Sequence, residues 1–371
     1  MSAGLDETKR STGTGRRQGA SGERLRVAVI GATGYAGAEL VRILARHPAV
    51  ELVGLGGRGR NAEPVETVHP HLAATRLYLD EEVPAADAVF LALPHGAAVE
   101  RVPAIVDAGV TVIDLGPDFR LKDPADYPRW YRFEHARPDL LGQAVYGLPE
   151  LHREELIALA DRPVRIVGSP GCHATASILA LAPLARAGLL GDVVVDAKTG
   201  VSGAGRETKP EYMFGEVNES VRAYGIGGHR HIAEIEQELA FAGAATGAAN
   251  PGATGVDFLP NLIPMTRGIL AAAHVRPTRP TSQDELDDLF AAAYTDEPFV
   301  TVVSAAPATK HVTGSNEARI HASYDSRTGR ILVISVIDNL VKGAAGQAVQ
   351  SFNLVHGLAE TAGLEQLPLA P

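Results

Sequence analysis

The chain of 371 residues is poor in sulfur and in aromatic side chains: it has one cysteine, three methionines and one tryptophan, and aromatic residues make up 5% of it. A single cysteine cannot build an internal disulfide framework, which indicates a reducing compartment. No apolar run approaches the length of a membrane-spanning helix, and residues 1–24 lack the apolar stretch of a secretory signal. We therefore expect a cytoplasmic protein that binds no membrane.

Positive charge is scarce as well. The chain has 34 Lys and Arg against 44 Asp and Glu, a formal net charge of −10, which argues against a nucleic acid as partner. An anionic small molecule would need a local basic site. Residues 1–24, rich in Gly, Ser, Thr and Arg, are expected to form a disordered tail, and the length of the remainder predicts two domains.

The first part of the chain, residues 25–171, repeats one pattern. Short apolar runs end in Gly or Pro, as buried parallel strands do where their carboxyl ends carry functional loops. These runs are 25–30, 50–55, 88–94, 110–116 and 164–171. Helical patterns lie between them, which predicts a Rossmann-type doubly wound parallel sheet of the α/β class for this dinucleotide-binding domain.

Longer strands follow, and they predict a second domain of the α+β class over residues 172–337, with a largely antiparallel sheet. The expected strands are 193–198, 254–263, 269–275, 318–324 and 331–337. Residues 338–371 contain a final helical pattern of mixed polarity, which we expect to return to the dinucleotide-binding domain.

The sequence GATGYAG (31–37) stands directly between a predicted strand and a predicted helix. In that place Gly31 permits a tight turn, Gly34 lets the backbone approach a pyrophosphate and Gly37 permits close helix–strand contact. The free N–H groups of the helix start would then face the anion. An ordinary turn between strand and helix is the alternative. The predicted cofactor-binding residues of this loop are Gly31, Thr33, Gly34, Tyr35 and Ala36.

The segment after the second strand indicates which dinucleotide is bound. An NAD site usually carries an acidic residue here, which accepts a hydrogen bond from the ribose 2′-hydroxyl. This chain has LVGLGGRGRN, without Asp or Glu but with Arg58 and Arg60. Guanidinium groups suit a 2′-phosphate, so NADP is the predicted cofactor. Alternatively, both arginines are merely solvated.

The only thiol, Cys172, lies in SPGCHATASILALAPL (169–184), between the end of a strand and the start of a helix. The positive end of the helix would lower the pKa of this thiol and stabilise the thiolate. A lone cysteine can also be a small buried apolar residue. The adjacent His173 is interpreted as incidental, because neighbouring residues on a helix do not face each other.

A candidate acid/base lies in RAYGIGGHRHIAEIEQEL (222–239), where two glycines precede His229 and His231. Two histidines at this spacing can bind a metal, but no nearby carboxylate or cysteine set completes a tetrahedral site, so no metal is predicted. A solvent-facing cluster at the start of a helix is the other alternative.

Together these segments resemble the N-acetyl-γ-glutamyl-phosphate reductase family of arginine biosynthesis, from about Leu25 to the C-terminus. The resemblance rests on GATGYAG (31–37), FLALPHG (90–96), DLGPDFRL (114–121), YGLPEL (146–151), PGC (170–172), SGAGR (202–206), GGHRH (227–231), RGIL (267–270) and IDNLVKGAAGQAVQ (337–350). The family shares its fold and thiol chemistry with aspartate-semialdehyde dehydrogenase and, more distantly, with glyceraldehyde-3-phosphate dehydrogenase. The second domain is therefore expected to resemble that of the latter enzyme and to serve catalysis and oligomerisation.

The resemblance implies roles for particular residues. Cys172 corresponds to the nucleophile, and the general acid/base is a histidine of HRH, for which we favour His229 with His231 as the second choice. Substrate contacts are expected from Arg120 and His231. Further cofactor contacts are expected from Pro94, Ser202, Gly203 and Asn339.

The implied reaction is the NADPH-dependent reduction of N-acetyl-L-glutamyl 5-phosphate to the 5-semialdehyde, with phosphate release, through a cysteine thioester in a homodimer or homotetramer. Two segments depart from the family pattern: PGCHAT (170–175) replaces the common PGCYPT, and HRHIAEI (229–235) replaces HRHTPEI. Both also resemble the sister lysine-pathway enzyme, whose substrate is 2-aminoadipate 6-phosphate bound to a carrier protein. Two other classes stay open, a cysteine hydrolase and a non-catalytic NADP-binding regulator.

Overall fold

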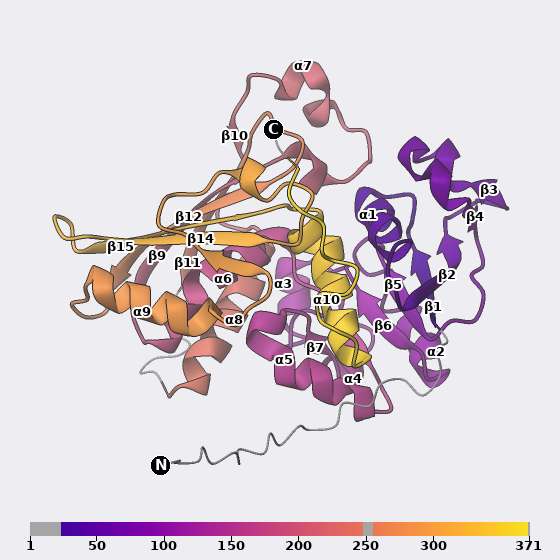
Figure 1. Ribbon diagram of the computed structural model, residues 1–371, viewed down its shortest axis with the longest axis horizontal. Coiled ribbons are helices and arrows are strands. Elements are labelled where there is room, and N and C mark those ends of the chain that lie inside the picture. The colour runs from indigo at the N-terminus through magenta and orange to yellow at the C-terminus, as the bar shows by residue number, and fades with distance from the viewer. Residues whose placement is uncertain (1–23, 248–254, 370–371) are drawn as a thin grey trace, which may run out of the picture.

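The computed structural model describes residues 24–247 and 255–369, and it contains two sheets with helices packed on them (Figure 1). Of the predicted tail, only Arg24 lies within the described residues. In these ranges no helix is both long and apolar enough to cross a membrane.

The first sheet has eight strands in the order β3-β4-β2-β1-β5-β6-β8-β7. All neighbours in it are parallel except β3 and β4. The strands are β1 (Leu25–Ile30), β2 (Val50–Gly56), β3 (Glu63–Pro64), β4 (Tyr78–Asp80), β5 (Ala88–Leu91), β6 (Thr111–Asp114), β7 (Val145–Tyr146) and β8 (Ile166–Gly168). Because β1 lies between β2 and β5, the chain reverses its direction of winding there, and crevices at such points bind ligands.

The helices of this part are α1 (Tyr35–Leu44), α2 (Val102–Asp107), α3 (Asp126–Trp130), α4 (Pro138–Leu141) and α5 (Pro149–Ala158). They are joined by α10 (Gly346–Val355) from the end of the chain, which follows a π-helical turn, Val341–Ala345. Phe352 of α10 packs against Phe90 of β5 and belongs to the same apolar core as Val27 and Leu40. The last helix therefore completes the core beneath the first sheet.

The second sheet has seven strands in the order β10-β11-β9-β12-β15-β14-β13, and four of its six pairings are antiparallel. Its strands are β9 (Leu190–Thr199), β10 (Arg222–Ala223), β11 (Val256–Leu262), β12 (Ile269–Pro277), β13 (Val300–Val302), β14 (Ala318–Asp325) and β15 (Arg330–Ile337). The helices α6 (Cys172–Arg186), α8 (His231–Ala245) and α9 (Gln283–Tyr294) share its apolar core, and α7 (Phe214–Val217) lies on a long excursion after β9. The predicted fold class, a doubly wound α/β sheet plus an α+β part, is confirmed.

The second sheet buries one face and leaves the other open. Along β11 the alternation is strict: Val256 and Phe258 are buried, whereas Asp257 and Leu259 are exposed. Val194 of the neighbouring β9 is 38% exposed on the same open face as Leu259. A single chain therefore covers only half of this sheet.

Candidate active site

The loop between β1 and α1 has the conformation that its glycines predict. Gly31 has φ +90°, and a side chain there would overlap the carbonyl oxygen of Ala92. A side chain at Gly37 would overlap the backbone of Gly31. Helix α1 begins at Tyr35 after Gly34, and no side chain caps its first N–H groups. The loop thus presents free donors at a helix start, which fits the pyrophosphate of a dinucleotide.

The two arginines after β2 differ in their surroundings. Arg60 forms an ion pair with Glu63 at 2.5 Å, and a Cβ on Gly57 would lie 2.9 Å from Arg60 Cγ and 3.2 Å from Thr33 Cγ2. The Arg60 side chain thus lies beside the phosphate loop. Arg58 is exposed and forms no hydrogen bond or ion pair with any described residue.

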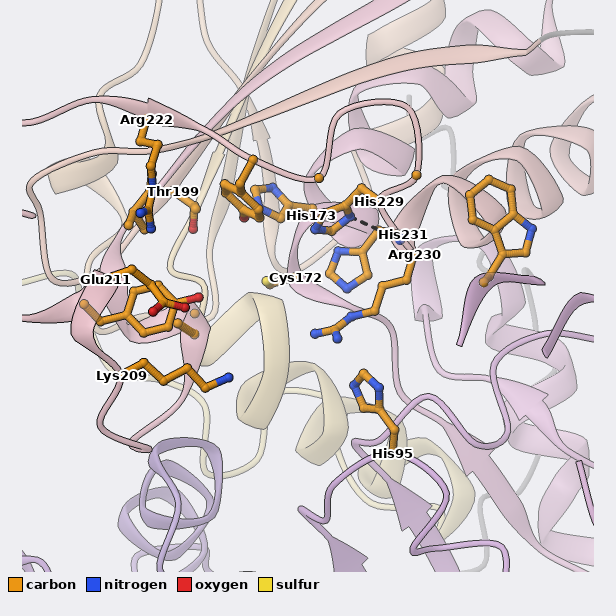
Figure 2. A pocket seen from close by; sticks show the side chains of 18 of the residues that line it. His95, Cys172, His173, Thr199, Lys209, Glu211, Arg222, His229, Arg230 and His231 are labelled. Carbon is orange, nitrogen blue, oxygen red and sulfur yellow. Dashed lines mark hydrogen bonds between the residues drawn. The ribbon is translucent and has the colours of Figure 1, made fainter. Parts of the chain in front are cut away.

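A cavity of about 700 Å³ contains the single thiol (Figure 2). Its walls come from segments far apart in the sequence: the loop after β5, the start of α6, the end of β9, the excursion that carries α7, and the start of α8. The lining includes His95, Trp130, Arg132, Cys172, His173, Thr199, Gly203, Lys209, Glu211, Tyr212, Arg222, Tyr224, His229, Arg230 and His231.

Cys172 is the first residue of α6, as the sequence predicts, but its thiol is not acidic. The π-helical turn packs against it, because a Cβ on Gly343 would lie only 2.7 Å from Cys172 Cβ. Burial raises the pKa of the Cys172 thiol, and the His173 N–H together with the charges of Arg120 and Arg230 only partly oppose that rise. The prediction of a lowered pKa is therefore wrong in its net direction, and the thiol needs a neighbouring base.

The raised pKa of the Cys172 thiol predicts how its alkylation depends on pH. Because only the thiolate reacts with iodoacetamide, the alkylation rate of Cys172 should keep rising beyond pH ~8.5, the ordinary midpoint of a thiol. The same cysteine in urea-unfolded chain is the matched control and should titrate at the lower, ordinary pH. A folded-state midpoint below the unfolded one would contradict the burial argument.

Three imidazoles gather next to the thiol. The rings of His229 and His231 are 4.8 Å apart, and the His173 ring lies 5.6 and 5.8 Å from them. Burial lowers the pKa of His229 to about 4 and that of His173 to about 3, and it lowers the pKa of His231 as well. All three are therefore neutral near pH 7, each with one ring nitrogen that carries no proton. Among the described residues, no three His, Cys, Asp or Glu side chains are arranged to hold a metal ion.

The three histidines are held differently. His229 is half-buried, and its Nδ1 accepts the backbone N–H of His231 at 3.3 Å, the dashed line in Figure 2. His231 is buried against Gly171, where any side chain would overlap its imidazole. His173, interpreted above as incidental, forms a hydrogen bond of 3.0 Å with the hydroxyl of Tyr224 and lines the cavity.

Arg120 does not line this cavity. Its Nε donates to the carbonyl of Ser169 and its Nη2 to the carbonyl of Leu115, both at 2.7 Å, while its Nη1 pairs with the buried Glu234 at 3.0 Å. Glu234 also accepts the Gly171 N–H at 2.9 Å. The structure therefore gives Arg120 a different place from the predicted substrate contact: it braces the backbone in front of Cys172.

A second cavity, of about 640 Å³, adjoins the first. Its lining includes Tyr35 at the start of α1, Ser202 and Leu340, and it shares Lys209 and Tyr212 with the thiol cavity. We call the two adjoining cavities the cleft; it has Tyr35, next to the phosphate loop, at one end and Cys172 at the other.

Three residues predicted at the cofactor lie together beside this cleft. Asn339 Nδ2 donates to Ser202 Oγ at 3.0 Å, and its Oδ1 accepts the Gly268 N–H at 2.8 Å. A Cβ on Gly203 would lie 3.6 Å from Asn339 Nδ2. Pro94 lies in the loop after β5, next to the cavity residue His95.

Sequence reasoning missed many of the cavity residues, among them His95, Lys209, Tyr224 and Arg230. Arg230 stands between the two predicted histidines, and His95 directly follows Pro94, the last residue of the apolar run 88–94. Their positions in the sequence could therefore have indicated both. Lys209 and Tyr224 lie in polar, glycine-containing segments whose spacing indicates no partner.

Models of two protein families match most of the chain. One is described as semialdehyde dehydrogenase, NAD binding domain, over residues 26–159, and the other as semialdehyde dehydrogenase, dimerisation domain, over residues 172–339. The curated N-acetyl-gamma-glutamyl-phosphate reductase of Heliobacterium modesticaldum is 46% identical over 360 residues, 94% of this chain and 100% of that protein. The enzyme of the same name from Symbiobacterium thermophilum is 48% identical over 350 residues, 92% and 97% of the two chains.

Solved structures agree on the fold. Aspartate semialdehyde dehydrogenase II of Vibrio cholerae aligns with a TM-score of 0.67 at 19% identity, over 90% of this chain and 98% of that one. Aspartate semialdehyde dehydrogenase of Candida albicans, solved with NADP, aligns with a TM-score of 0.65 at 16% identity, over 92% and 99%.

Proposed function

The chain belongs to the N-acetyl-gamma-glutamyl-phosphate reductase family, and we propose that it reduces N-acetyl-L-glutamyl 5-phosphate to N-acetyl-L-glutamate 5-semialdehyde, with NADPH as reductant and release of phosphate. The observation that carries the proposal is the joined cleft: a glycine loop for a dinucleotide at one end, and at the other a single cysteine beside neutral histidines. A cysteine hydrolase would not need the dinucleotide loop, and a non-catalytic NADP-binding regulator would not need the cysteine and its histidines.

The proposed chemistry begins with the thiol. Cys172 passes its proton to a neutral imidazole, for which we propose His229, and the sulfur attacks the acyl-phosphate carbonyl carbon. The bond from that carbon to the phosphate oxygen breaks, phosphate leaves, and a thioester remains on Cys172. Bound NADPH would supply the hydride that reduces this thioester. The oxyanion so formed would take the proton that His229 holds, which gives the hemithioacetal. The hemithioacetal then collapses to the aldehyde and the thiolate as His229 takes the hydroxyl proton back.

The residues proposed to hold the cofactor surround the cleft. We propose the phosphate loop for the pyrophosphate, Arg58 and Arg60 for the 2′-phosphate, and Asn339 with the Ser202 segment for the nicotinamide end. Residues 25–171 would form the dinucleotide-binding domain and residues 172–337 the catalytic domain, and the segment 338–371 would return to the first. His231 and Pro94 are proposed to border substrate and cofactor respectively.

The second family model carries the description dimerisation domain, and we propose a homodimer or homotetramer of a cytoplasmic enzyme. The open face of the second sheet, with Val194 and Leu259 exposed, is the surface that a second copy would cover.

One experiment tests the activity and its rival substrate together. Run in reverse, with NADP⁺ and inorganic phosphate, the enzyme should oxidise N-acetylglutamate semialdehyde, and this oxidation should require phosphate. The alternative substrate is carrier-bound 2-aminoadipate semialdehyde. The names of the relatives favour the glutamyl compound, whereas PGCHAT and HRHIAEI favour the alternative. Preference for the carrier-bound substrate would reverse the assignment.

The paired arginines after β2 give a prediction about the cofactor. Replacing both Arg58 and Arg60 by Ala should weaken NADPH binding far more than NADH binding, because only NADPH carries the 2′-phosphate. A loss of roughly 1–3 kcal/mol per charge-assisted contact is expected. Dissociation constants from nicotinamide fluorescence would measure it.

The single variants refine this test. Arg58 has no partner among the described residues to compete with the phosphate, whereas Arg60 must share its charge with Glu63, so Arg58→Ala should have the larger effect. If NADPH and NADH binding weaken equally, or neither does, the arginines do not contact that phosphate.

A further inference from the structure

We propose that Arg230 binds the phosphoryl group of the acyl phosphate, and inorganic phosphate in the reverse reaction. The inference rests on the proposed function, and it names the residue that binds the leaving group of the substrate.

Arg230 is an uncommitted charge in the cavity wall. It lies between His229 and His231, immediately before α8, and Figure 2 shows its guanidinium extending toward the space between Cys172 and His95. It forms no hydrogen bond or ion pair with any residue that the structure describes. Arg120, the other cation that acts on the thiol, is engaged by Glu234 and two carbonyls. Arg230 therefore has all its donors available for a ligand.

The charge of Arg230 reaches the reacting sulfur. Burial raises the pKa of Cys172, and the charge of Arg230 opposes that rise. Burial lowers the pKa of the imidazoles of His95, His229 and His231, and Arg230 adds to that lowering. Those imidazoles are neutral near pH 7, so each can offer an N–H to an anion without competing for the guanidinium. Glu234, whose carboxylate lies 3.9 Å from His231 Nε2, is already engaged by Arg120, two tyrosine hydroxyls and a backbone N–H.

The substrate's geometry decides which of its anions belongs there. The phosphoryl group is bonded through one oxygen to the carbon that the sulfur attacks, whereas the α-carboxylate is four carbon–carbon bonds away, roughly 5 Å when extended. The cation that lies beside Cys172 in the cavity wall with no partner among the described residues, Arg230, must therefore meet the phosphoryl group, and a guanidinium matches its oxygens in a fork. Lys209 and Arg222 lie on the other side of Cys172 in Figure 2, with Glu211, and are left for the carboxylate end.

This placement gives Arg230 a part in bond cleavage. As the sulfur attacks, the electron pair of the carbon–oxygen bond passes to the departing phosphate. A fixed guanidinium stabilises that growing charge without giving up a proton. In the reverse direction, the same group would hold phosphate for attack on the thioester.

The test measures the reverse reaction with phosphate and semialdehyde varied separately. Arg230→Met should raise the KM for inorganic phosphate by about 10- to 100-fold, the usual effect of losing a charge-assisted contact, while the KM for semialdehyde and the Kd for NADPH stay within about twofold. Arg230→Lys, which keeps the charge but not the fork, should recover part of the phosphate affinity. In Arg230→Met the alkylation midpoint of Cys172 should also move to higher pH, because a cation near the thiolate is lost.

Arg222→Met is the matched control, an arginine of the same cavity, and should show the reverse pattern. It should raise the KM for N-acetylglutamate semialdehyde but not that for 4-acetamidobutanal, which lacks the carboxylate, nor that for phosphate. A raised semialdehyde KM in Arg230→Met with an unchanged phosphate KM would overturn the assignment. Failure of the unmodified enzyme to oxidise the semialdehyde would instead refute the proposed function.

Discussion

Cys172→Ser should abolish reduction of the acyl phosphate, by roughly 10⁴-fold or more, as removal of a covalent nucleophile commonly does. The neutral imidazoles beside Cys172 can take a proton from a thiol of raised pKa, but a serine hydroxyl is a far weaker acid, and its ester resists hydride where a thioester accepts it. Acyl-phosphate-dependent oxidation of NADPH, followed in a single turnover, measures the loss.

The control for this variant is its affinity for the cofactor, which binds at the other end of the cleft. The Kd for NADPH should be nearly unchanged, because Cys172 is absent from the cavity that contains Tyr35 and Ser202. Cys172→Ala should be as inactive as the serine variant, since neither forms a reducible thioester. Turnover above about one percent in either variant would be incompatible with covalent catalysis on this residue.

The parts of the site that depend on local signals could be predicted from the sequence. The glycines of GATGYAG, which follows a strand and leads into a helix, indicated the turn at Gly31, whose φ is +90°. Pro170 and Gly171 before an unbroken apolar helical pattern placed Cys172 at a helix start. Very short strands such as β3 and β7, of two residues each, have no periodicity to detect.

The parts that depend on packing could not be predicted. The raised pKa of the Cys172 thiol follows from burial, to which Gly343, 171 positions further along the chain, contributes. Arg120 was expected at the substrate because its motif matched, yet a carboxylate 114 positions away, Glu234, takes its charge. Adjacency on a helix was a poor guide for His173, because its neighbours in the cavity come from other segments.

The two histidines of the HRH segment should separate clearly when each is replaced. His229→Asn should slow the chemical step by roughly 10²–10⁴-fold, the usual contribution of a general acid/base. His229 is half-buried in the cavity wall, and its Nδ1 is held by the His231 N–H, so its Nε2 is the nitrogen left to exchange a proton with the thiol and with a developing oxyanion. His231 is buried against Gly171, so His231→Asn should act mainly on substrate affinity or on the fold around Cys172.

Single-turnover hydride transfer in each variant distinguishes chemistry from affinity, because it is measured with substrate already bound. In His229→Asn, Cys172 should still be alkylated by iodoacetamide, since α6 still begins at that residue and Arg230 still faces it. The alkylation should be slower only to the extent that the imidazole also takes up the thiol proton. The opposite result, with hydride transfer lost in His231→Asn and kept in His229→Asn, would give the acid/base role to the imidazole that lies against Gly171.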